Sequence, residues 1–145
     1  KQLTQEGGRT FAQVKPANVR KLYIPKATKD EQSILSTLYD YMEILNNPIC
    51  KDLDLQSLLF YLFEQIIDGC VYELFFREHM RERGIDIIQY LQNYIEPLGN
   101  YDYIGKYNQI MTIYYKINST DNEIRRRLKL FVSRSPEYLK TIIQH

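Results

Sequence analysis

The sequence contains no tryptophan, only two cysteines, six glycines and five prolines among 145 residues, and its formal net charge is +1. The near balance of 19 basic and 18 acidic residues excludes a tail-like polycation, although it leaves room for a local basic patch. Cys50 and Cys70 are too far apart to form a metal-binding C-x-x-C pair. Cys70 lies in an apolar run, where we expect it to pack as a small hydrophobe.

The sequence also has no signal peptide and no apolar run of about 18 residues or more, so a soluble cytoplasmic protein without a membrane partner is expected. The length predicts one main domain, large enough to bury a sizeable core. The chain begins at Lys1 without an initiator methionine, and we expect it to be a fragment of a larger protein.

The N-terminal residues 1–27 differ from the rest of the chain. Gly7 and Gly8 favour a turn, Pro16 favours one helical turn, and Pro25 pushes the residue before it into an extended conformation. This segment is expected to be irregular or to contain a short β-strand. We interpret it as the tail end of a separate domain.

Residues 28–145 read as a helical domain, because apolar residues recur at helical spacing. The sequence therefore predicts a mainly α fold, a multi-helix bundle with a small irregular or β N-terminal segment. The expected helices run from a capping box at Thr28 and Glu31 to residue 45, from near Asp52 or Asp54 to Gly84, over about 85–95, over about 101–117, from a second capping box at Thr120 and Glu123, and from Ser135.

The stretch DGCVYELFFREHMRERG at 68–84 combines acids, bases and aromatics. Glu73 and Arg77 are four residues apart, and Glu78 and Arg81 are three apart. Such pairs stabilise an exposed helix by about 0.2–0.5 kcal/mol each, so this spacing predicts surface ion pairs rather than a site of chemistry.

No catalytic site can be assembled from the sequence. His79 and the terminal His145 are the only histidines, whereas a zinc site needs three or four ligands. The chain has no G-x-S-x-G motif, no cysteine next to a histidine and no phosphate-binding glycine loop. A structural role is favoured for His79, and we expect no catalytic residue, metal or cofactor in this chain.

Two basic groups are candidates for DNA binding. The first is the run EIRRRLKL, in which three consecutive arginines fan over about 200° of helix, so only one or two of them can face a phosphate. Arg125 and Arg127 are the candidates, and the favoured alternative is a solvated face balanced by Asp121 and Glu123. The second group lies in the N-terminal segment, where an ordinary surface is an equal alternative. Its candidates are Arg9, Lys15, Arg20 and Lys21.

Two stretches resemble one family. QVKPANVRKLYIPKATKDEQSILSTLYDYM at 13–42 resembles the end of a DNA target-recognition domain, where an extended IP segment precedes an acidic-Gln pair, here Glu31 and Gln32. IIDGCVYELFFREHMRERGIDIIQYL at 66–91 resembles a C-terminal element of TaqI-like, adenine-specific DNA methyltransferases of restriction–modification systems. The two stretches occur in the order expected for that family, and residues 92–145 match no motif.

The resemblance implies a C-terminal, non-catalytic part of such a methyltransferase, which supports target recognition on double-stranded DNA and contacts the catalytic parts. The adenine-methyltransferase motif N-P-P-Y is absent, because Ile49 and Cys50 replace its last two residues, and so are the cofactor glycine motif and the nuclease signature. S-adenosylmethionine would then belong to the parent enzyme alone. The alternative is a helical protein–protein module of a multisubunit restriction enzyme, which binds through tyrosine-rich helix faces.

Overall fold

The computed structural model of the chain describes residues 27–134, and within this range the chain forms six helices and no strand. The expectation of a mainly α fold is confirmed. The expected irregular or β N-terminal segment and the expected helix from Ser135 lie outside the described residues. The division near residue 27 into two units stays a prediction.

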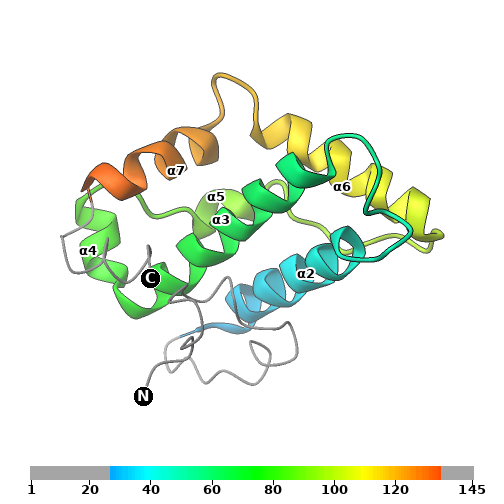
Figure 1. Cartoon of the computed structure of the whole chain (residues 1–145). Coiled ribbons are helices and arrows are strands. Elements are labelled where there is room, and N and C mark those ends of the chain that lie inside the picture. Colours follow the sequence, from blue (N-terminus) through cyan, green and yellow to red (C-terminus); the bar gives the residue numbers. More distant parts are fainter. Residues whose placement is uncertain (1–26, 135–145) are drawn as a thin grey trace, which may run out of the picture.

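The helix α3 is the centre of the fold, since it contacts α2, α6 and α7 (Figure 1). Helix α2 also contacts α6, and the short α5 contacts α7. In chain order the helices are α2 Lys29–Leu45, α3 Gln56–Phe75, α4 Arg77–Glu82, α5 Ile88–Leu91, α6 Tyr103–Ile117 and α7 Glu123–Arg134.

The first capping box is present as predicted. The backbone N–H of Glu31 donates to Thr28 Oγ1 at 3.1 Å, and the backbone N–H of Thr28 donates to Glu31 Oε1 at 2.9 Å. Two N–H groups at the start of α2 are thereby satisfied by side chains, which fixes where the helix begins.

A large apolar core lies between α2, α3 and α6. It contains fully buried side chains from each helix, and the ring of Phe63 meets the edge of Tyr41 with 5.5 Å between ring centres. Cys70 is buried in this core as a free thiol, so its predicted packing as a small hydrophobe is confirmed. A second, smaller cluster lies at the α4 end of the fold and contains Tyr72, Met80, Ile85 and Phe131.

The predicted start of the long helix is wrong. Neither Asp52 nor Asp54 caps it, because α3 begins at Gln56 after Leu55, whose backbone has a φ of 67°. The Gln56 side-chain amide donates to the carbonyl of Leu45 at 2.6 Å, which ties the start of α3 to the end of α2. The helix α3 therefore starts from a turn that is held to the preceding helix, a little later in the chain than predicted.

The predicted helix through residue 84 is also interrupted. Phe76 leaves the helical region with φ −127° and ψ 47°, which divides the stretch into α3 and α4. The predicted stop at Gly84 is confirmed by its φ of 69°. The N–H of Gly84 donates to Arg81 O at 3.1 Å and that of Ile85 to Met80 O at 3.0 Å, the hydrogen-bond pair of a Schellman motif.

The expected helix over 85–95 is shorter than predicted, since α5 covers only Ile88–Leu91. Helix α6 agrees with its prediction, and Asp102 caps it by accepting from the Gly105 N–H at 2.8 Å. Among the helices of residues 27–134, none is both long and apolar enough to cross a membrane.

Candidate functional site

The six predicted DNA-binding residues divide into two groups in the structure. Arg9, Lys15, Arg20 and Lys21 lie outside the described residues. Arg125 and Arg127 both lie on α7, near its start. Their surroundings decide which of the two has a guanidinium that remains available to a ligand.

The start of α7 is capped differently from the prediction. Asn122, not Thr120, is the capping residue, since its Oδ1 accepts from the N–H groups of Ile124 at 2.8 Å and Arg125 at 3.2 Å. The predicted second capping box is wrong because α7 begins at Glu123 itself, directly after Asn122. The Glu123 carboxylate is therefore free to bind arginines one turn further along the helix.

Arg127 points into the fold. Its Nη1 donates to Asp86 Oδ1 at 2.9 Å and to Asp86 O at 3.0 Å, and its Nε donates to Glu123 Oε2 at 2.5 Å. Its guanidinium carbon lies 4.5 Å from the centre of the Tyr90 ring, a cation–π distance. With 13% of its side chain exposed, Arg127 joins α7 to the α5 region.

Arg126 lies on a solvated face and is paired with an acidic residue, as the alternative interpretation of the basic run predicted. Its Nη2 binds the Glu123 carboxylate, and more than half of its side chain is exposed. Hydrogen bonds from Arg127 and then Arg126 lower the pKa of Glu123. The prediction that Glu123 balances the basic run is confirmed. Glu123 pairs with two of the three consecutive arginines, Arg126 and Arg127.

Arg125 differs from both neighbours. Its backbone N–H is used in the cap, but within residues 27–131 its guanidinium has no hydrogen bond or ion pair. The same holds for Lys129, four residues and therefore about one helical turn further along α7. Two unpaired cations thus lie on one side of α7.

These cations border a groove between three helices, which we call the α3–α6–α7 groove. Its volume is about 390 Å³, within the range of ligand-binding clefts. Leu58 and Tyr61 are half exposed at this groove, whereas Leu62 and Tyr114 are buried. The lining residues are Leu58, Tyr61, Leu62, Gln65, Tyr114, Asn118, Arg125, Leu128 and Lys129.

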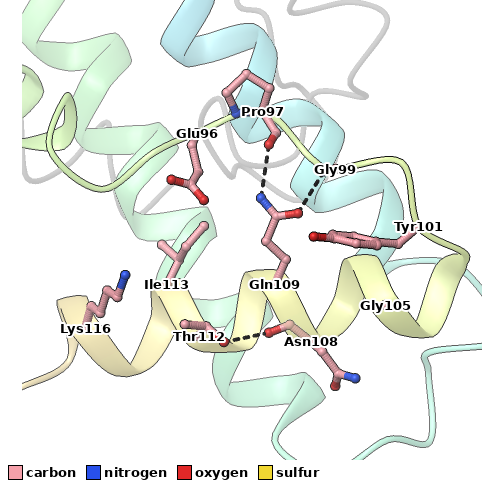
Figure 2. Close-up of a pocket in the computed structure, with 10 residues that line it drawn as sticks. All are labelled: Glu96, Pro97, Gly99, Tyr101, Gly105, Asn108, Gln109, Thr112, Ile113 and Lys116. Atoms are coloured by element: carbon pink, nitrogen blue, oxygen red, sulfur yellow. Dashed lines mark hydrogen bonds between the residues drawn. The ribbon is translucent and has the colours of Figure 1, made fainter.

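A second groove of about 450 Å³ lies between α6 and the segment 96–101 (Figure 2). The Gln109 side chain crosses it: Oε1 accepts from the Gly99 N–H at 2.8 Å, and Nε2 donates to the Pro97 carbonyl at 3.0 Å. Its amide is therefore committed to holding the loop on α6. Tyr101 is exposed and turns its ring toward this groove in Figure 2.

The segment 96–101 is also held by Tyr41 of α2. The Tyr41 hydroxyl donates to the Glu96 carbonyl at 2.5 Å and accepts from the Glu96 N–H at 3.0 Å. Burial raises the pKa of Tyr41 to about 12, so this hydroxyl keeps its proton and can donate at every physiological pH. The Gln109 amide at the second groove and the Tyr41 hydroxyl beneath it therefore serve as structural ties of this segment.

In the stretch 68–84, a buried carboxylate takes the place of the first of the two predicted surface pairs, Glu73 with Arg77. Glu73 is 2% exposed, and its Oε1 accepts from the N–H groups of Ile87 at 2.7 Å and Ile88 at 3.0 Å. Burial raises the pKa of Glu73, and these two hydrogen bonds oppose the shift. The prediction of an exposed Glu73–Arg77 pair is wrong, because α3 turns Glu73 toward the start of α5.

Arg77 instead binds across the fold. Its Nη1 and Nη2 donate to Glu31 Oε2 at 2.8 Å and Glu31 Oε1 at 3.1 Å, a two-pronged ion pair between α4 and the start of α2. The hydrogen bonds from Arg77 lower the pKa of Glu31, and burial opposes that shift. Glu31 therefore serves the capping box and this long-range contact at once.

The remaining candidates for chemistry in the described residues are metal-ligating side chains, His79 and Cys70. No group of three or more His, Cys, Asp or Glu within them is arranged to hold a metal ion. His79 is half buried, and its Nε2 has no hydrogen-bond partner there. Burial raises the pKa of the Cys70 thiol well above its usual range, which disfavours the reactive thiolate.

Sequence reasoning missed Asp86 and Tyr90 as partners of Arg127, since no local spacing links residues about 40 positions apart. The sequence could have indicated Lys129 as a partner of Arg125 at the same site, because the two are four residues apart and so lie on the same helical face. We compared the chain with protein-family models, with curated proteins and with solved structures, and none of the three gives a match.

Proposed function

We propose that this chain is the C-terminal, non-catalytic part of a restriction–modification DNA methyltransferase, and that it supports DNA target recognition. The observation that carries the proposal is the ion pair between Glu31 and Arg77. Glu31 belongs to the stretch that resembles the end of a target-recognition domain, and Arg77 to the stretch that resembles the C-terminal helical element. A helical module that braces a recognition segment needs a rigid contact of this kind.

The electrostatics of the helical part are compatible with this supporting role. Its buried charges are engaged in internal contacts, as the pairing of Arg127 with Asp86 illustrates. We assign the DNA contacts to the N-terminal residues Arg9, Lys15, Arg20 and Lys21. Arg125 is the remaining candidate on α7, and Arg127 is dropped from the proposed DNA surface because its guanidinium is used inside the fold.

The test is binding of the full 145-residue chain to duplex DNA over a salt series. We expect affinity to fall as salt rises, with a slope of about −0.9 in log K against log salt for each phosphate neutralised. Reversing Arg9 and Lys15 together should weaken binding and flatten this slope. Arg81→Glu, a charge reversal at an exposed residue of α4, is the control that should change binding little.

Absence of duplex binding at low salt would contradict the DNA role of this fragment. The same conclusion would follow if the Arg9 and Lys15 reversal behaved like Arg81→Glu. A separate Arg125→Glu variant shows whether α7 adds to the DNA surface or serves another ligand.

A second candidate function is a helical protein–protein assembly module of a multisubunit restriction enzyme. The exposed aromatic and apolar side chains favour it, since large exposed apolar patches mark interaction sites. Tyr101, Tyr103 and Ile104 are exposed at the start of α6, and Leu58 and Tyr61 are exposed on α3. Stable association with a methyltransferase or motor subunit, without duplex binding at low salt, would favour this function.

A further inference from the structure

The α3–α6–α7 groove has an apolar interior. Leu62 and Tyr114 are buried at its base, and Leu128 adds a third apolar side chain from α7. Leu58 and Tyr61 extend this surface to solvent, with 52% and 58% of each residue exposed. A ligand that covers these two side chains would remove apolar surface from water, which lowers the free energy of the complex.

The tyrosine hydroxyls of the groove have their own partners. Gln65 Nε2 donates to the Tyr61 hydroxyl at 3.1 Å, and Asn118 Nδ2 donates to the Tyr114 hydroxyl at 3.3 Å. Each contact holds a ring in one orientation beside the groove. The apolar surface is therefore preorganised, which lowers the entropic cost of binding.

The charge of the groove has one sign. Arg125 and Lys129 line it, and no acidic side chain is among its lining residues. Neither cation has a hydrogen bond or ion pair within residues 27–131. A ligand that covers the apolar surface and places carboxylates over α7 would therefore satisfy both features.

We propose that the α3–α6–α7 groove binds an acidic amphipathic segment of a protein partner, with its apolar side chains on Leu58, Tyr61 and Leu62 and its carboxylates on Arg125 and Lys129. The inference rests on the second candidate function, because it gives the chemistry of the protein partner that an assembly module would bind. It favours a polypeptide over DNA, since a phosphate backbone offers no apolar group to cover Leu58 and Tyr61. Arg125 then serves the partner, and the N-terminal residues carry the DNA contacts.

The test uses a fluorescent helical peptide of about 15 residues, a length at which an isolated helix is marginally stable, with leucines along one face and glutamates beside them. A matched peptide replaces every glutamate with lysine. Binding to the full chain is followed by fluorescence anisotropy, with an unlabelled DNA duplex as competitor. We expect the acidic peptide to bind and the lysine peptide to bind at least about tenfold more weakly.

Three variants locate the site. Arg125→Glu with Lys129→Glu should weaken the acidic peptide by about tenfold or more, and Leu58→Ala by a few-fold. The control Arg81→Glu reverses one positive charge outside the groove, half the charge change of the double variant, and should leave the affinity unchanged. The unfolding midpoint of each variant shows that the fold is retained.

The inference is overturned if the acidic peptide does not bind, if the groove variants match Arg81→Glu, or if the lysine peptide binds equally well. Displacement of the peptide by duplex DNA, together with loss of DNA binding in the Arg125 and Lys129 variant, would assign the groove to nucleic acid instead. Peptide binding without any DNA binding would contradict the proposed DNA role and leave the groove assignment standing. Failure of each proposal is thus recognised separately.

Discussion

The main core between α2, α3 and α6 and the α4 end of the fold are stabilised by different interactions. In the main core, side chains such as Phe63 and Leu38 are fully buried and apolar. At the α4 end, the apolar cluster of Tyr72, Met80, Ile85 and Phe131 is accompanied by three partly or fully buried charged groups, and each of these forms directional contacts. They are Glu73, Arg77 and Arg127. The difference teaches that the main core depends on filling volume, whereas the α4 end depends in addition on satisfying buried charges.

The two regions should therefore fail in different ways. Truncating a core side chain removes contacts and leaves a cavity, and the loss grows with the volume removed. Truncating one member of a buried ion pair leaves its partner charged, desolvated and without a counter-charge. Truncating a large core side chain and truncating a single guanidinium at the α4 end can therefore be compared by the free energy of unfolding that each loses.

The largest expected effect is in the main core. Phe63→Ala should lower the free energy of unfolding by about 3–5 kcal/mol, since the ring is fully buried and contacts Tyr41 edge-on. Phe75→Ala on the same helix is the control, because 45% of Phe75 is exposed, and it should cost about 1 kcal/mol or less. Urea unfolding measures both, and equal losses would contradict the placement of α3.

The second prediction concerns two neighbouring arginines of α7. Arg127→Ala should lower the free energy of unfolding by about 2–3 kcal/mol, below the 3–5 kcal/mol of a fully buried pair, because Arg127 keeps some exposure. Arg126→Ala should cost about 0.5 kcal/mol or less, because Arg126 is a surface partner of the same Glu123. Both variants lose one positive charge, so unfolding experiments compare burial directly.

A reversed order of the two arginine variants would show that the contact of Arg127 with Asp86 does not hold α7 in solution. Arg127→Lys provides a further comparison, since it keeps the charge but cannot form the same set of donors. We expect its stability to lie between those of the wild type and Arg127→Ala.

The sequence predicted features that depend on neighbouring residues. The Thr28–Glu31 capping box, the stop at Gly84 and helix α6 follow from spacings of a few residues, and all three are present. The second capping box failed because Asn122, one of several nearby residues that can accept an N–H, caps α7 in place of Thr120. Local rules place a helix start to within a few residues, but they do not identify its capping residue.

Features that depend on tertiary packing were not predictable. The spacing of Glu73 and Arg77 suggests an exposed pair, and only the position of α5 shows that Glu73 accepts from Ile87 and Ile88. The candidate site was predicted in the same partial way. The basic run indicated α7, whereas the roles of Arg125 and Arg127 depend on whether α3 and α6 or the α5 region lies beside each side chain.

The third prediction uses the pH dependence of Glu73 at the α4 end. Burial raises its pKa above the ordinary value of 4.5, so the folded protein binds this proton more tightly than the unfolded chain does. Its contribution to stability is thus fully present below about pH 4.5 and is lost as pH rises through the raised pKa. Glu73→Gln keeps an acceptor for the N–H groups of Ile87 and Ile88 without the charge. At neutral pH its free energy of unfolding should equal that of the wild type or exceed it by up to about 1 kcal/mol.

Glu31 should show the opposite sign, which makes it the matched comparison for Glu73. The hydrogen bonds from Arg77 lower its pKa, so its contribution is present above about pH 4.5 and is lost as pH falls through the lowered pKa. Glu31→Gln can keep the capping box, because glutamine is accepted at that position, but it loses the ion pair and should be less stable than the wild type at neutral pH. Urea unfolding from about pH 2 to pH 8 would show the Glu73→Gln variant gaining on the wild type with rising pH and the Glu31→Gln variant losing, the latter mainly below about pH 4.5. A change of both variants in the same direction with rising pH, relative to the wild type, would contradict this comparison. It would show that holding a carboxylate by backbone N–H groups and holding one by a guanidinium have the same effect at this end of the fold.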